Sequence, residues 1–185
     1  MLKGVSMNKN EILEQALYYL STNGVKFTMS QLATSLQISK KTIYTMFDSK
    51  ETLLLEVIEN SFREIKRSEK QIIESDLKLE EKIKKLIIVL PDRYQNLNWY
   101  KVGELKEKYP KIYEVLIYHL QSDWKPTLDL LQQGIKEGVL KDFNVDVFKL
   151  IVEGTMEHIL SNHQQIDYYQ ELEEMMNILM KGILK

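Results

Sequence analysis

The chain contains no cysteine, and glycine and proline are scarce, with seven and three copies among 185 residues. Without thiols it forms no disulfide, no thiolate zinc site and no cysteine nucleophile. It suits a reducing compartment, and we expect it to be cytoplasmic. The longest apolar runs, such as residues 86–90, are too short to span a bilayer. Residues 1–10 lack the apolar core of a secretory signal, so no membrane partner is expected. Met7 offers an alternative start, with residues 1–6 as a floppy leader.

A net charge of −2 argues against a protein that coats nucleic acid indiscriminately. The charge is uneven, because residues 1–67 hold nine Lys or Arg against seven Asp or Glu, whereas the remainder is net acidic. The stretch 26–50 holds four lysines and a single acid, Asp48. A basic patch on a mildly acidic body is typical of a protein that meets phosphate with one end, although the same lysines also fit an ordinary solvated surface.

Apolar residues recur with helical spacing along almost the whole chain, and no alternating pattern indicates a strand. We therefore predict an all-α fold, with a three-helix head and a helical-bundle body. Pro91 and Pro126 fall inside two of the expected helices and should kink or interrupt them. The expected helices, about nine in all, cover approximately residues 8–22, 28–36, 40–46, 49–73, 79–95, 99–108, 110–138, 144–162 and 168–184.

Three helices fall within the first 48 residues, and the last two are short and joined by a tight turn, which is a helix-turn-helix pattern. Thr28 and Ser39 are N-cap residues for the two short helices, and Gln31 completes a capping box with Thr28. Ile43 and Phe47 are spaced to anchor the last helix, which leaves its polar side free to enter a major groove. This geometry favours DNA binding. The alternative is a protein–protein interaction module that uses the same head without DNA.

The head resembles the N-terminal signature of the TetR family of transcriptional repressors over residues 12–57. The matching residues are Thr28, the pair Leu32-Ala33, the run Ile38-Ser39-Lys40-Lys41-Thr42-Ile43-Tyr44, then Phe47 and Ser49-Lys50-Glu51. The sequence departs from the commonest form at Gln37, where glycine is frequent, and at Lys41, where a small residue or proline is frequent. The backbone at Gln37 must therefore avoid or tolerate a positive φ.

This resemblance implies a ligand-responsive repressor that binds a near-palindromic double-stranded DNA operator as a homodimer. It implies a DNA-binding domain over residues 1–48 and a ligand-binding and dimerisation domain over residues 49–185. Tyr44 and Lys50 resemble the family's phosphate-contacting residues, and the helix opened by Thr28 can meet a phosphate at its N-terminus. Lysine suits guanine, and a threonine methyl suits thymine. The expected DNA-binding residues are Thr28, Ser30, Ser39, Lys40, Lys41, Thr42, Tyr44, Thr45 and Lys50.

The central helices carry aromatic residues with polar tips, which suit a pocket for a small apolar or aromatic effector. Ordinary core packing is the simpler explanation for any single one of them. The resemblance also implies a ligand cavity among these helices, and no cofactor is expected. The candidate ligand-binding residues are Tyr94, Trp99, Tyr100, Tyr113, Tyr118, His119 and Trp124.

The last two helices have apolar faces wider than one body requires, so two such pairs can form a four-helix bundle across a two-fold axis. Gly154 would let helices approach closely there. The competing interpretation is a purely internal core. The expected dimer-interface residues are Val145, Phe148, Val152, Met156, Ile159, Leu172, Met175, Met176, Leu179 and Ile183.

An enzyme is not expected. The sequence has no phosphate-cradling glycine loop, no dinucleotide fingerprint and no nucleophile elbow. Its histidines are His119, His158 and His163, and the last two are five residues apart, a poor spacing for a zinc site on one helix face. No metal site is predicted, although a zinc-dependent rise in thermal stability would revive that interpretation.

Overall fold

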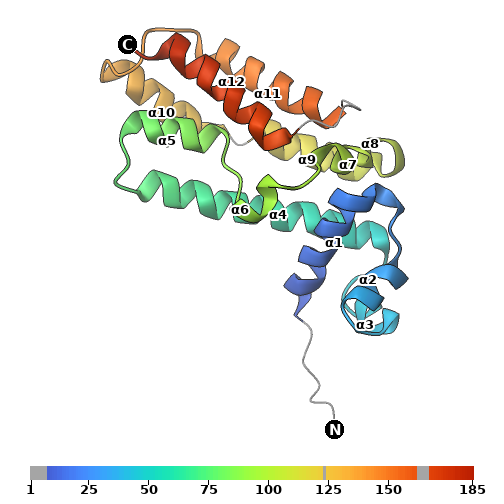
Figure 1. The fold of residues 1–185 in the computed structure, drawn as a ribbon. Helices are drawn as coiled ribbons and strands as arrows, with labels where there is room; N and C mark the ends of the chain where they lie inside the picture. The colour runs from blue at the N-terminus through green and yellow to red at the C-terminus, as the bar shows by residue number, and fades with distance from the viewer. Residues whose placement is uncertain (1–7, 123, 162–166) are drawn as a thin grey trace.

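The computed structural model describes residues 8–122, 124–161 and 167–185, and the regular structure in these ranges is helical (Figure 1). Apart from the helices, the described residues contain one isolated bridge, between Leu140 and Leu184. The predicted all-α fold is therefore confirmed. The elements are α1 Lys9–Asn23, the 3-10 turn η1 Gly24–Lys26, α2 Met29–Ser35, α3 Lys40–Tyr44, α4 Lys50–Glu74, α5 Leu79–Ile87, α6 Asp92–Gln95, α7 Trp99–Gly103, α8 Leu105–Lys108, α9 Pro110–Ser122, α10 Lys125–Lys136, α11 Val145–Ser161 and α12 Tyr168–Ile183.

The helices expected over 79–95, 99–108 and 110–138 are each divided in two, and the interruptions predicted at Pro91 and Pro126 are confirmed. The helix expected over 79–95 ends at Ile87, and α6 begins only after Pro91. Proline has no N–H for the helical ladder, so both prolines mark interruptions, and Pro126 stands in the first turn of α10. The helix expected over 99–108 divides at Glu104. The alternative start at Met7 and the expected helix end at Asn162 lie outside the described residues.

The head is built by N-caps that satisfy the first N–H groups of each helix. Asn8 forms a capping box with Glu11 at the start of α1, and Thr28 forms one with Gln31 at the start of α2. The serines before α3 and α4 accept a hydrogen bond from the third residue of each helix, without a capping box. The helices then enclose a small core, whose fully buried members include Ile12, Leu20, Leu32, Ile43, Phe47 and Leu53.

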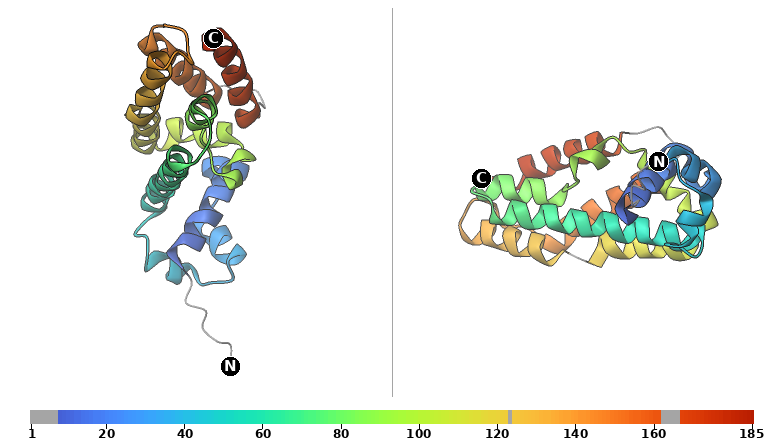
Figure 2. Two further views of the ribbon diagram at one scale, coloured as in Figure 1. Left: turned by 90° about the vertical axis from the view of Figure 1, so that its left-hand side faces the viewer. Right: turned by 90° about the horizontal axis from the view of Figure 1, so that it is seen from below.

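The long helix α4 joins the head to the body. Its 25 residues give it a length of about 37 Å, and it packs on α1 in the head and on α5 and α9 in the body. The helices α11 and α12 lie on the other side of the body, and the C-terminus lies at the end farthest from α2 and α3 (Figures 1 and 2). One element therefore reaches both the three-helix head and the body core.

A second junction between head and body runs through α7, which packs on both α1 and α11. The approach to α11 is close, because a Cβ atom at Gly103 would lie only 1.9 Å from the carbonyl oxygen of Leu160. At the far end, the backbone N–H of Lys141 donates to the carbonyl of Ile183 over 2.7 Å, which ties α12 to the loop after α10. The body is thus fixed at both of its ends.

Candidate functional site: a DNA-reading head and a body cavity

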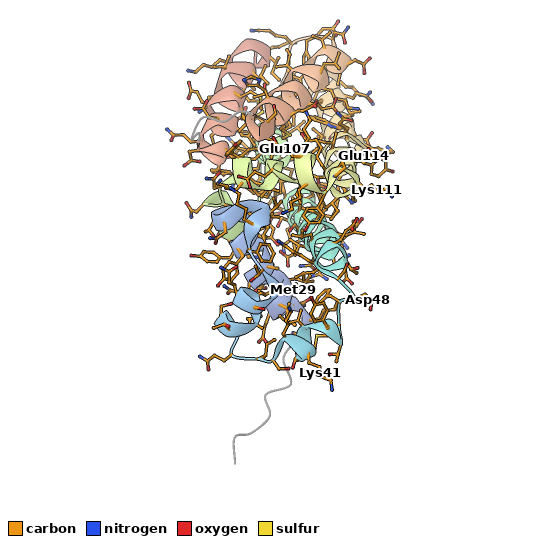
Figure 3. The ribbon with its side chains drawn as sticks, turned by 90° about the vertical axis from the view of Figure 1, so that its right-hand side faces the viewer. Met29, Lys41, Asp48, Glu107, Lys111 and Glu114 are labelled. Carbon is orange, nitrogen blue, oxygen red and sulfur yellow. The ribbon has the colours of Figure 1, made fainter. Side chains whose placement is uncertain are left out.

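The helix α3 presents a polar surface at the tip of the molecule. Lys40, Lys41, Tyr44 and Thr45 are exposed, and Lys41 lies at the end of the head distant from the body (Figure 3). On the opposite side, Ile43 and the nearby Phe47 are almost fully buried, as expected for anchors. This arrangement holds α3 in the head core while leaving its polar side available to a DNA groove.

Two of the expected reading residues also build α3. The Ser39 hydroxyl accepts from the backbone N–H of Thr42 over 3.0 Å, and the two hydroxyls lie 2.8 Å apart. Thr42 is half-buried, so its hydroxyl belongs to the cap as well as to the surface. The Lys40 ammonium lies 5.7 Å from the centre of the Tyr44 ring, a cation–π contact that orders both exposed side chains.

The turn between α2 and α3 has a positive φ of 55° at Gln37. The backbone N–H of Ile38 donates to the carbonyl of Ala33 and that of Gln37 to the carbonyl of Thr34, so the end of α2 is closed by bonds of the Schellman type. Of the two options left open by the sequence, Gln37 tolerates the left-handed conformation. The turn thus closes through a positive φ at a residue other than glycine.

The helix α2 packs on α3 in the head, and Thr28 and Ser30, at the start of α2, are both exposed. The Thr28 hydroxyl accepts from the Gln31 N–H over 3.2 Å, and Gln31 Oε1 accepts from the Thr28 N–H over 2.8 Å. The predicted capping box is therefore confirmed. The box satisfies two N–H groups at the start of α2 and fixes its first turn.

Lys50 turns inward at the start of α4. Its ammonium donates to the carbonyl of Val25 over 2.6 Å and to the carbonyl of Phe27, and it lies 4.1 Å from the Phe27 ring centre. Burial, together with the positive charge of Lys108, lowers the pKa of Lys50. The sequence pattern gave no indication that this lysine braces the loop leading into α2.

A cavity of about 110 Å³ lies in the body, and its wall is mostly apolar. It is bounded mainly by α4, α5 and α9, with contributions from the first residues of α10 and α12. Leu17 of α1 also reaches this wall, so a head helix touches the cavity directly. A ligand held here would contact the two helices, α1 and α4, that carry the head.

Three of the candidate ligand residues line this cavity: Trp99, His119 and Trp124. The His119 ring stacks on Phe62 with centroids 4.5 Å apart, and its Nε2 lies 3.3 Å from a carboxylate oxygen of Glu59. Both indole N–H groups donate to backbone carbonyls within the protein. The tryptophans therefore offer the cavity ring surface and no free donor.

The other four candidates lie outside the cavity wall. Tyr94 is buried and its hydroxyl bonds to Glu64. Tyr100 is half-buried and lines a second pocket, of about 350 Å³, near α8. Tyr113 is buried under Lys106, and Tyr118 is 66% exposed. Aromatic content alone did not separate these positions from the ones that face the cavity.

A polar brace joins α6 to the head and to α4. Arg93 Nη1 donates to Glu14 Oε1 over 2.6 Å, and its other terminal nitrogen bonds to Glu64, which also accepts from Tyr94. Burial opposes ionisation of Glu64, but the hydrogen bonds from Arg93 and Tyr94 outweigh it and lower its pKa. Burial, and then Glu64 itself, raises the pKa of Tyr94 to about 12. Sequence reasoning missed this brace, because its members are far apart in the chain.

Most of the expected dimer-interface residues pack inside the protomer. Seven of the ten are buried, and the other three, Val145, Met175 and Leu179, are half-buried. The outer face of α11 and α12 carries different apolar side chains, which are exposed. Its members are Val147, Leu150 and Ile151, the open Gly154 and, from α12, Ile178.

The described residues hold no group of three or more His, Asp or Glu side chains arranged to bind a metal ion. His163 lies outside them. Nor does any helix in the described ranges combine the length and apolarity that a membrane crossing requires.

Comparison with known proteins agrees with the geometry of the head. Residues 12–57 match the family model of bacterial regulatory proteins, tetR family. Over 177 residues the chain is 28% identical to an uncharacterized HTH-type transcriptional regulator, YvaF of Bacillus subtilis, and the match covers 93% of each protein.

The fold of the whole chain is also shared with solved structures. The TetR-family regulator PfmR of Thermus thermophilus superimposes with a TM-score of 0.68 at 17% identity, covering 98% of this chain and 100% of that one. A transcriptional regulator from Saccharomonospora viridis, solved in complex with choline, gives 0.63 at 16% identity over 96% and 98%.

A capped helix-turn-helix head on a helical body defines a DNA-binding transcriptional regulator. The chain is similar to the TetR family of such regulators, because residues 12–57 match its family model and the whole fold is shared with a solved member.

Proposed function

We propose that this protein is a cytoplasmic, ligand-responsive repressor that binds a near-palindromic operator as a homodimer. Residues 1–48 would form the DNA-binding domain and residues 49–185 the ligand-binding and dimerisation domain. The proposal rests on the contact between the head and the cavity, because Leu17 of α1 and Ile58 of α4 both line the cavity. The family match favours DNA over a protein-binding role for the head.

The head would bind DNA through its exposed polar surface. Lys40, Lys41, Tyr44 and Thr45 would meet bases and phosphates from α3, with Ser39 and Thr42 at its start. Thr28 and Ser30 would contact phosphate beside them. Lys50 would act from inside, because its ammonium holds the loop that positions α2.

Two heads must be linked for an operator with two half-sites. The outer face of α11 and α12 supports a dimer, because an apolar helical stripe that includes Leu150, 66% exposed, and Ile178, 62% exposed, is costly to leave in water. Gly154 has open space where a side chain would be, so a partner helix can approach closely there. A two-fold dimer places its heads for half-sites about 34–36 Å apart.

Selection of bound sequences from random DNA tests the DNA-binding part. We expect a near-palindrome, and an affinity that falls steeply as salt rises, because each lysine–phosphate contact releases counterions. A single half-site bound as tightly as a pair would contradict the dimeric mode. Salt-independent binding would contradict the role of the lysines.

Ligand response would follow from the position of the cavity. A ligand shifts the head only if its affinity for the protein differs between two positions of the head. The coupling free energy between two such sites is typically about 1–3 kcal/mol. Operator DNA must then alter ligand affinity by the same factor as ligand alters operator affinity. Titration calorimetry of a bound ligand, with and without operator, measures that factor, and identical affinities would show that the body is no sensor.

A further inference from the structure

Two buried residues on the cavity wall carry hydroxyl groups for which the structure shows no hydrogen bond. Thr127, in the first turn of α10, is 7% exposed, and Tyr168, at the start of α12, is 6% exposed. Among the described residues neither hydroxyl takes part in a hydrogen bond. Neither hydroxyl oxygen is among the fully enclosed side-chain atoms without a hydrogen-bond partner, which in the described residues are Tyr113 Oη and Glu153 Oε1. Both hydroxyls therefore remain reachable from the cavity, where they can hydrogen-bond to a ligand or a water molecule.

The remaining polar groups of the wall are already satisfied within the protein. The Lys66 ammonium lies 2.7 Å from a carboxylate oxygen of Glu69, so their charges cancel. The Ser61 hydroxyl donates to the carbonyl of Val57 over 2.9 Å. A ligand with a formal charge would therefore lose its hydration without gaining a free counter-charge, which is unfavourable.

We infer that the effector is a neutral, mainly apolar molecule whose carbonyl or hydroxyl oxygen hydrogen-bonds to Thr127 and Tyr168. This inference rests on the proposed ligand response and names the chemistry of its ligand. Tyr168 is well placed to donate, because its ring lies 5.3 Å from that of Trp99 and is held by it. Burial raises the pKa of Tyr168, so the phenol keeps its proton at neutral pH.

The volume of the cavity determines how large a test ligand can be. Its volume of about 110 Å³ is comparable with an engineered apolar cavity of about 150 Å³ that binds benzene. Ethylbenzene, acetophenone and benzoate share one ring and differ in polarity. Their affinities for the full-length protein, measured by titration calorimetry without DNA, separate an apolar, a neutral oxygen-bearing and an anionic ligand.

Acetophenone should bind about threefold to tenfold more tightly than ethylbenzene, the gain expected of one net hydrogen bond, and benzoate should bind most weakly. In the double variant with Thr127→Val and Tyr168→Phe, acetophenone and ethylbenzene should bind equally. The single variants then show which hydroxyl the ketone uses. Tyr118→Phe is the matched control, because this tyrosine is exposed and lies outside the cavity wall.

The inference is overturned if benzoate binds best, if the ketone and the hydrocarbon bind equally to the parent protein, or if the double variant keeps the preference. Absence of binding by all three probes at millimolar concentration also overturns it. A separate titration with operator DNA tests the proposed function. If the ketone preference is present but operator affinity does not change, the ligand chemistry stands and the proposed response fails.

Discussion

Arg93 of α6 holds Glu14 of α1, with Nη1 and Oε1 2.6 Å apart. The same guanidinium bonds to Glu64 of α4. The residues just before and after this brace, Leu90 and Trp99, line the cavity. In the proposed ligand response, a ligand that displaces this segment would act on the head directly through this contact.

Replacing Arg93 with alanine should lower the stability of the protein and weaken the coupling between the body cavity and the head. We expect the free energy of unfolding to fall by about 1 kcal/mol, a modest value because the Arg93 side chain is 45% exposed. Urea denaturation measures this loss, and the ligand-induced change in operator affinity should also shrink. Arg67→Ala, on the exposed side of α4, is the control. If Arg93→Ala keeps its full stability and its full ligand response, these contacts contribute neither to stability nor to coupling.

Stability should depend on pH through Glu64. Burial disfavours its carboxylate, but the hydrogen bonds from Arg93 and Tyr94 prevail, so its folded pKa is below the ordinary value of about 4.3. The resulting stabilisation is complete above that ordinary value and disappears as the pH falls through the lowered one. Glu64→Gln should therefore flatten the acid limb of stability against pH. Glu74→Gln, with a side chain 65% exposed, should leave the limb unchanged, and the same slope in both variants would contradict the assignment.

Lys50→Met should destabilise the head and weaken DNA binding alike for every sequence. The substitution keeps much of the apolar stem but leaves the carbonyls of Val25 and Phe27 without their donor, at a cost of about 1–2 kcal/mol. Binding to operator and to unrelated DNA should decline by a similar factor, because the effect is on the position of α2 and not on base contacts. Lys26→Met, an exposed neighbour, is the control for lost charge. Altered base preference in Lys50→Met would contradict this role.

Gln37→Gly should stabilise the protein. Gln37 is the one non-glycine residue with positive φ among the described residues, and this conformation costs an L side chain about 1 kcal/mol. Part of the gain is offset by the greater freedom of glycine in the unfolded chain. Thermal or urea unfolding should show a rise of about 0.5 kcal/mol, whereas Ser35→Gly within α2 should lower stability. A loss in Gln37→Gly would mean that its side chain makes a compensating contact.

Leu150→Lys should yield a monomer. Leu150 is the most exposed apolar residue of the outer face of α11 and α12, and a charge there is unfavourable in an apolar interface. Sedimentation measures the change in mass. Leu55→Lys places the same change on α4, at a leucine 36% exposed, and should keep the dimer. If the parent protein and Leu150→Lys have the same mass, this face is not the interface.

The head could be predicted in detail from the sequence because its signals are local. Thr28 and Gln31, the capping pair, are three residues apart, and the anchors Ile43 and Phe47 are four residues apart. For Gln37 the sequence left two options, a backbone that avoids a positive φ or one that tolerates it, and the structure shows the second. Lys50 was harder, because its partners are the carbonyls of Val25 and Phe27, more than twenty residues away, and backbone carbonyls carry no sequence signal.

The sequence predicted that the body is helical, but not which residues make its contacts. Helical spacing shows that α11 has apolar positions on more than one side, but not which side meets α9 and which meets solvent. The expected interface therefore fell on buried residues such as Phe148 and Val152, while the exposed positions are Leu150 and Ile151. Likewise, Thr127 carried no sequence signal, because a hydroxyl becomes informative only when its neighbours are known.

The closeness of α7 to α11 limits how this regulator can be changed. Any side chain at Gly103 would collide with the backbone of Leu160, and a backbone atom cannot rotate away as a side chain can. Libraries intended to reshape the body cavity should leave position 103 unaltered. Diversity is better placed at Thr127, where a change of chemistry meets the cavity without forcing two helices apart.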